Sequence, residues 1–351
     1  MFDGRVREPF WGNAGAVATL EQMVSTGRIP QTLLFNGPEG IGKATLARRF
    51  AAAVLGEAGK IEQDDLSLPA NLERISEREK WTSEKRNEEP LFFATQSDFV
   101  TFPPDGPMRQ IGMPQMRFLR EQAQFAPLHG SRRVFLIDGI DRANDQAANS
   151  LLKTLEEPPP HLVIIMTATN AYDLLPTIRS RSVPVQLTAL GPEEMQSFLT
   201  TQAKVDRPER RLALANGSPG QALSIDLDLY DKRRGAMLAL LRVAAGQAAF
   251  STWVKYAESI SASKSEKLDE LLRVLEILLE DLLLLAHGNL NIRNVDLQRD
   301  LQQLSGTVTF AWIRLAVTRV EALGQLVRRN IQKAIALDAL IVELSRAAGA
   351  R

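Results

Sequence analysis

The first half of the chain alternates short apolar runs with segments whose apolar residues recur at helical spacing. The runs are four or five residues long and predict buried strands at 32–35, 134–137, 162–166 and 183–187. The segments before and between these runs predict helices at 17–27, 43–55, 114–124 and 145–156. Short strands that alternate with helices are typical of a parallel sheet with crossover helices, so the predicted fold class is α/β.

After residue 187 the strand signal fades and the pattern becomes helical. Two shorter helices are predicted at 192–202 and 207–215, followed by a turn at 217–220. Long amphipathic helices are then predicted at 229–245, 265–286, 307–328 and 331–347. We therefore predict three domains, which are a phosphate-loop α/β domain over 1–187, a small helical lid domain over 188–225 and an all-α domain over 226–351.

One segment of the first half breaks this pattern. Fifteen of the 31 residues at 60–90 are charged, and Pro69 and Pro90 interrupt the segment. We interpret it as a solvated insertion that is helical in part and whose composition is compatible with mobility.

The composition excludes several classes of binding site. Lys plus Arg equals Asp plus Glu at 42 each, so a role on DNA would need a local basic face or contacts made by partners. The chain has no cysteine, which rules out disulfides and thiolate zinc sites. His129, His161 and His287 are too far apart in sequence to suggest a zinc site. No signal peptide is evident at the start, and the longest apolar stretch, 282–286, is far too short to span a membrane. We expect a cytoplasmic protein.

The strongest chemical signal lies between the strand at 32–35 and the helix at 43–55. Residues 37–43 fit the pattern G-x-x-x-x-G-K, with Gly37, Gly42 and Lys43 at its fixed positions and a further glycine, Gly40, inside the loop. Such glycines let backbone N–H groups surround phosphate oxygens, and the lysine reaches the terminal phosphates. The pattern predicts a phosphate-binding loop with ATP as the cofactor.

Two positions bear on the magnesium ion that accompanies ATP. The residue after the lysine is normally Ser or Thr, whose hydroxyl holds the metal, but here it is Ala44. Thr45 lies about 100° further round the helix, so we expect its hydroxyl to point elsewhere. Asp138 ends the strand at 134–137, where phosphate-loop proteins place a second magnesium ligand, although a turn carboxylate is the simpler alternative. For Asp141 we favour capping a loop or helix.

Several motifs resemble those of one family. The run AANSLLKTLEEPP at 147–159, the element IRSRS at 178–182, and the stretches WGN, LLFNGPEGIGKATLA and LLPTIRSR resemble the AAA+ clamp-loader subunits of bacterial DNA polymerase III. The match is closer to the delta-prime type than to the motor type, gamma/tau. It covers most of 10–225 and continues faintly at 330–337.

The resemblance implies an AAA+ phosphate-loop domain, a small helical lid and a helical collar through which subunits assemble. The implied partners are gamma/tau and delta subunits in a hetero-oligomeric ring, with the sliding clamp and primed DNA reached through the complex. Arg181 is implied to be an arginine finger that acts on a neighbouring subunit, and the alternative is that Arg179 or Arg181 is a surface salt-bridge residue. Thr169 matches the sensor-1 position, with a strand-end cap as the alternative reading. Relatives often carry four zinc-binding cysteines after the phosphate-loop helix, which this chain lacks, so no zinc is expected.

Three catalytic parts are missing from the chain's own site. Ala44 offers no hydroxyl for magnesium, Gly139 replaces the glutamate that AAA+ ATPases use to orient water, and Gln221 stands where the sensor-2 arginine is common. We predict a delta-prime-like subunit that binds ATP weakly at most, has little or no ATPase alone and helps to load the clamp. The alternatives are a motor subunit that hydrolyses ATP, a small-molecule kinase, and a scaffold in which Arg181 is dispensable.

Overall fold

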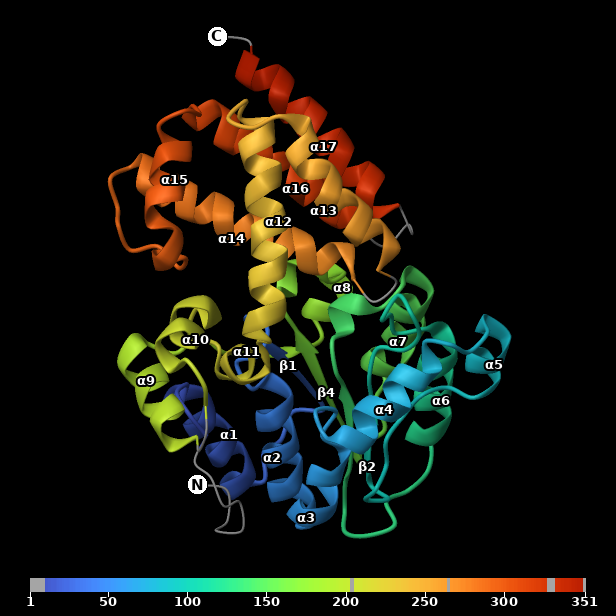
Figure 1. Ribbon diagram of the computed structural model, residues 1–351. Helices are drawn as coiled ribbons and strands as arrows, with labels where there is room; N and C mark the ends of the chain where they lie inside the picture. Colours follow the sequence, from blue (N-terminus) through green and yellow to red (C-terminus); the bar gives the residue numbers. More distant parts are fainter. Residues whose placement is uncertain (1–9, 203–204, 264–265, 327–331, 350–351) are drawn as a thin grey trace. The chain divides into compact units, whose positions relative to one another are not determined.

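The computed structural model describes residues 10–202, 205–263, 266–326 and 332–349 (Figure 1). The chain divides into two compact units. The first runs to Asp206 and includes Ala215–Leu223, and the second consists of Arg207–Leu214 and the residues from Ser224 onward. The three-domain division, with a separate lid over 188–225, remains a prediction.

A five-stranded parallel sheet forms the centre of the first unit. Its strands are β1 (Thr32–Asn36), β2 (Phe99–Phe102), β3 (Arg133–Ile137), β4 (Leu162–Ala168) and β5 (Val183–Gln186). They lie in the order β2-β3-β4-β1-β5, and each paired neighbour runs parallel. This confirms the predicted fold class. Strand β2, which follows the charged insertion, was not predicted from the sequence.

Helices cover both faces of this sheet. Alternate strand residues point to opposite faces; Leu33 and Phe35 pack with α1 (Ala14–Thr26) and α2 (Lys43–Leu55), whereas Leu34 packs on the other face. That second face is covered by α6 (Met113–Ala123), α7 (Asp145–Glu156) and α8 (Pro176–Arg179). Burial on both faces explains why these strands are continuous apolar runs.

Local signals set the limits of α2 and α7, whose predicted and observed spans coincide. The side chain of Asn144 accepts a hydrogen bond from the backbone N–H of Ala147, which caps the start of α7. Three prolines at 158–160 follow the end of the helix. The predicted turn at 217–220 is partly wrong, because α11 (Pro219–Ser224) already begins at Pro219. The other helix of the first unit after the sheet is α9 (Pro192–Thr201).

The charged insertion is folded onto the first unit. It contains α3 (Ala58–Ile61), α4 (Pro69–Arg78), α5 (Ser83–Glu88) and a short 3-10 helix, η1 (Glu62–Asp64). Ile75 is buried together with Leu91 and Phe93, which lie just beyond the insertion. The prediction of partial helix is correct, but the segment is not simply solvated, because it has a small apolar core.

The second unit is helical around its own apolar core. The core joins residues from most of its helices, including the fully buried Trp253. The helices are α10 (Pro208–Ala215), α12 (Leu227–Ala244), α13 (Phe250–Ala262), α14 (Leu268–Ala286), α15 (Gln298–Ser305), α16 (Phe310–Leu326) and α17 (Lys333–Gly349). Helices α13 and α15 were not predicted. Residues 265, 327, 328, 330 and 331, which the predicted helices or the collar resemblance include, lie outside the described residues.

Candidate functional site

The glycine-rich loop leaves the carboxyl end of β1 and leads directly into α2. Its glycines have positive φ values, +151° at Gly37, +76° at Gly40 and +93° at Gly42, in a region that residues with a Cβ rarely adopt. A Cβ on Gly37 would also lie 2.2 Å from the carbonyl oxygen of Leu187. The loop therefore requires these glycines, and it has the strand–loop–helix setting of a phosphate loop.

The ammonium of Lys43 turns back onto this loop from the first residue of α2. Its Nζ donates hydrogen bonds to the carbonyl oxygens of Gly37, at 2.6 Å, and Pro38, at 2.7 Å. Burial lowers the pKa of Lys43, while nearby carboxylates, Asp138 foremost, act in the opposite direction. The structure thus brings the predicted lysine and glycines into one site.

The start of α11 is bonded to the same loop. The hydroxyl of Ser218 donates to the carbonyl oxygen of Glu39 at 2.9 Å, and the N–H of Gly220 donates to that of Gly40 at 2.8 Å. Gln221 also lies beside the loop, because its backbone nitrogen would be 3.0 Å from a Cβ on Gly40. The residue that faces the loop from the predicted sensor-2 position is therefore uncharged.

Asp138 lies at the end of β3, next to the end of β4. The hydroxyl of Thr167 donates to Asp138 Oδ1 at 2.6 Å and accepts from the N–H of Gly139 at 2.7 Å. Burial raises the pKa of Asp138, and the Thr167 hydrogen bond and the charges of nearby bases oppose this. Thr167 was not predicted as a site residue from the sequence. Its signal was a hydroxyl within an otherwise apolar strand.

Thr169, the predicted sensor-1 residue, follows β4 and is exposed. Its backbone N–H donates to Asp141 Oδ2 at 2.9 Å. Asp141 therefore caps a loop, as we favoured from the sequence. The sensor role of Thr169 stays a prediction.

The site fits a phosphate group better than it fits magnesium. The loop offers backbone N–H groups and the amine of Lys43, which are ligands for phosphate oxygens. Phosphate-loop enzymes hold magnesium through a Ser or Thr after the lysine together with an acid at a strand end. Here Ala44 supplies no oxygen, so of these two ligands only the acid, Asp138, is present. The residues present therefore do not fit a magnesium-bound nucleotide.

The predicted arginine finger lies at another edge of the first unit, in the turn after α8. Arg181 Nη2 donates to Glu156 Oε1 at 2.9 Å and Nη1 donates to the carbonyl oxygen of Thr177 at 3.1 Å. About a third of its side chain is exposed. Nearby, the guanidinium of Arg179 lies 5.0 Å from the ring centre of Tyr172, which is 82% exposed. Among the described residues, Arg181 makes no hydrogen bond or ion pair with the chain's own phosphate loop.

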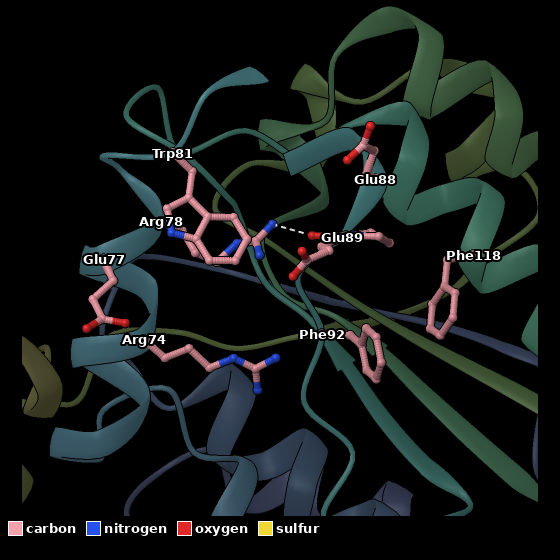
Figure 2. Close-up of a pocket in the computed structure, with 9 residues that line it drawn as sticks. Arg74, Glu77, Arg78, Trp81, Glu88, Glu89, Phe92 and Phe118 are labelled. Atoms are coloured by element: carbon pink, nitrogen blue, oxygen red, sulfur yellow. Dashed lines mark hydrogen bonds between the residues drawn. The ribbon is translucent and has the colours of Figure 1, made fainter. Parts of the chain in front are cut away.

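A hollow of about 400 Å³ lies away from both of these places, between the insertion and α6 (Figure 2). Its lining is mixed aromatic and charged, and consists of Arg74, Glu77, Arg78, Trp81, Glu88, Glu89, Pro90, Phe92 and Phe118. Both arginines and glutamates line it.

Arg78, which lines this hollow, is held by an ion pair and by further contacts with the protein. Its Nε and Nη2 donate to the two carboxylate oxygens of Asp105 at 2.8 and 2.7 Å. Nη2 also donates to the carbonyl of Glu89 at 2.6 Å (Figure 2). The ring of Trp81 lies 4.5 Å from its guanidinium carbon. The charge-assisted pair with Asp105 connects the insertion to the loop after β2.

The three histidines each contact different groups. His129 contacts Ser97 and Asp98, His161 contacts the carbonyl of Ala123, and His287 contacts a carbonyl of its own helix. Within the described ranges, no group of three or more His, Asp or Glu side chains could hold a metal ion. No helix in that part of the chain is both long and apolar enough to cross a membrane.

Comparison with known proteins gives one family. Residues 12–191, just over half of the 351 residues, match the family described as DNA polymerase III, delta subunit. The match contains the phosphate loop, Asp138 and Arg181.

Curated relatives are similar over the same part of the chain. The tau subunit of DNA polymerase III from Salmonella typhimurium is 28% identical over 221 residues, which are 61% of this chain and 31% of the relative. The delta-prime subunit from Pseudomonas aeruginosa is 31% identical over 201 residues, 53% of this chain and 52% of the relative. The chain thus spans about a third of the length of the first of these and about half of the second.

Among solved structures, a DNA polymerase III gamma subunit-related protein from Thermotoga maritima has a TM-score of 0.47 at 15% identity, covering 94% of this chain and 99% of that protein.

Proposed function

The chain belongs to the DNA polymerase III delta subunit family of clamp-loader proteins, and on this premise we propose that it is a delta-prime-like subunit of a DNA polymerase III clamp loader. In this role it assembles with gamma/tau and delta type subunits and helps to open the sliding clamp and load it on primed DNA. A cytoplasmic location goes with this role and stays a prediction.

The proposal rests on a contrast within the first unit between an incomplete ATP site and a retained arginine that could act on a neighbouring subunit. The phosphate loop keeps Gly40, Gly42 and Lys43, yet it lacks a magnesium hydroxyl at Ala44 and a water-orienting carboxylate at Gly139. Each missing part removes orders of magnitude in rate in enzymes that depend on it. We therefore expect the chain to bind nucleotide weakly and not to hydrolyse it.

The group that could serve another subunit is retained. Arg181 is always charged, lies in an exposed turn and has N–H groups left over from its two protein contacts. A guanidinium placed on the transferring phosphoryl group of a neighbour stabilises the charge that develops there. This supports a trans role for Arg181, with Thr169 left as an unassigned candidate near the chain's own loop.

The test is reconstitution of the complete clamp loader with Arg181→Ala. We expect clamp-stimulated ATPase to fall by about a thousandfold, the lower end of the effect of an arginine finger. Arg179→Ala is the matched control, because this arginine lies two residues away but stacks on Tyr172. Unchanged ATPase and loading with Arg181→Ala would rule out the trans finger.

The second candidate is an ATP-hydrolysing motor subunit, which the similarity to a tau subunit favours. Turnover by the purified chain alone separates the two. A motor would hydrolyse ATP in a magnesium-dependent way and lose this activity with Lys43→Ala, whereas a delta-prime-like subunit would show no turnover to lose.

A further inference from the structure

Arg181 is held by groups from two helices of the first unit. Glu156 is the last residue of α7, and its carboxylate accepts from Arg181 Nη2 at 2.9 Å. The carbonyl oxygen of Thr177, in α8, accepts from Nη1 at 3.1 Å. These two contacts set both the position of the guanidinium and the direction of its plane.

The arrangement leaves most of the guanidinium free for a ligand. An arginine carries five N–H donors in a planar fork, and the two contacts to Glu156 and Thr177 use two of them. Three donors remain, and 34% of the side chain is exposed. The free part of the fork can still bind an anion while Glu156 holds the other part.

The surroundings of Glu156 favour a cation at this place. Glu156 ends a helix of 12 residues, and the carbonyl end of a helix carries partial negative charge. Both partners are partly exposed, 34% for Arg181 and 52% for Glu156, so the pair contributes little to stability. Its main physical effect is to restrict the rotamers of a long side chain before any ligand arrives.

We propose that Glu156 is a positioning residue for Arg181, which keeps the guanidinium directed out of the first unit and ready for the phosphates bound by a neighbouring subunit. This inference rests on the proposed trans role of Arg181. Glu156 itself touches no substrate. It acts by restricting the conformations of the Arg181 side chain in advance, so that less conformational entropy is lost when the transition state forms.

A double-mutant cycle in the reconstituted clamp loader tests the proposal. We expect Glu156→Ala to lower the kcat for ATP about tenfold and to leave KM unchanged, because the contact made by Arg181 matters in the transition state. Glu156→Gln keeps an oxygen that can accept from Nη2, so it should restore most of this loss. In the Arg181→Ala background, Glu156→Ala should have no further effect, since the residue it positions is absent.

Glu157→Ala is the matched control, because Glu157 is the exposed next residue and its side chain makes no hydrogen bond or ion pair within the described part of the chain. Thermal unfolding of every variant checks that the fold is kept. A loss from Glu156→Ala that persists in the Arg181→Ala background, or that equals the effect of Glu157→Ala, overturns the positioning role. If Arg181→Ala alone has no effect, the trans finger fails first and the positioning role fails with it.

Discussion

The backbone N–H of Gly220 donates a hydrogen bond to the carbonyl oxygen of Gly40 across 2.8 Å. This bond joins the first turn of α11 to the middle of the phosphate loop, although the two residues are far apart in sequence. The approach is so close that a Cβ on Gly220 would lie 2.7 Å from the Gly40 oxygen.

Gly220→Ala should therefore destabilise the first unit. The added methyl group must displace backbone atoms, and such overpacking costs about 1–3 kcal/mol. Gly235→Ala is the matched control, because Gly235 lies inside α12, where an added Cβ would meet no neighbouring atom within 4 Å. That change should stabilise the helix by about 0.5–1 kcal/mol. Urea unfolding measures both, and equal midpoints for the two variants would contradict the contact.

Restoring the missing hydroxyl tests whether Ala44 is the reason for weak magnesium-dependent binding at the phosphate loop. Ala44→Ser places an oxygen directly after Lys43, where phosphate loops bind magnesium. We expect tighter, magnesium-dependent binding of a fluorescent ATP analogue by the isolated chain, measured by titration with and without magnesium. ATP hydrolysis should remain absent, because Gly139 and Gln221 supply neither a base nor a cation.

Lys43→Ala added to Ala44→Ser should abolish the gained binding and serves as its control. Efficient hydrolysis by Ala44→Ser alone would show that the changes at 139 and 221 are not limiting.

The features predicted from the sequence are those whose signals are local. Asn144 and the prolines at 158–160 fixed the ends of α7, and the spacing of Gly37, Gly42 and Lys43 located the phosphate loop. Each signal lies within a few residues of the structure it specifies, so no knowledge of the tertiary fold was needed.

The features that were missed depend on distant partners. Thr167 joins the site because β3 and β4 pair, which brings it to Asp138, 29 residues away. Arg78 and Asp105 are 27 residues apart, and their pair turns a charged segment into a packed one. The four-residue strand β2 was missed because Thr101 interrupts its apolar residues, so that it does not read as a continuous apolar run.

The pair between Arg78 and Asp105 should dominate the stability of the insertion. The side chains are only 5% and 10% exposed, so Arg78→Met would leave a buried carboxylate without its counter-ion. Removing one partner of such a pair costs about 3–5 kcal/mol. Chymotrypsin should then cleave at Trp81 much faster than in the wild type, because the ring loses the guanidinium against which it lies.

Arg109→Met provides the comparison for an exposed pair. Arg109 and Glu79 are 36% and 27% exposed, and pairs of this kind contribute less than about 1 kcal/mol. Cleavage at Trp81 should change little in this variant. Equal protease sensitivity of the Arg78 and Arg109 variants would show that Arg78 does not anchor the insertion.

Ionisation of Asp138 should make the stability of the fold fall as pH rises. Burial raises the pKa of Asp138 in the folded chain, so the folded state binds this proton more tightly than the unfolded state. The stability from this site is then fully present below the ordinary aspartate pKa and is lost as pH rises through the folded pKa. Asp138→Asn keeps an oxygen that can accept from Thr167 but carries no charge. The variant should match the wild type in acid and have the higher Tm at neutral pH.

Thr167→Val tests how the hydrogen bond from Thr167 affects the pKa of Asp138. The Thr167 hydroxyl donates to Asp138 and favours its ionised form. Without this hydrogen bond the pKa of Asp138 should rise further, and the loss of stability with increasing pH should extend to higher pH than in the wild type. Thermal unfolding from pH 4 to pH 9 measures all three proteins on one scale, with roughly 1.4 kcal/mol corresponding to each unit of pKa difference. A Tm difference between Asp138→Asn and the wild type that does not grow with pH would mean that Asp138 is charged in the folded protein without penalty, and that its carboxylate remains available to a metal ion.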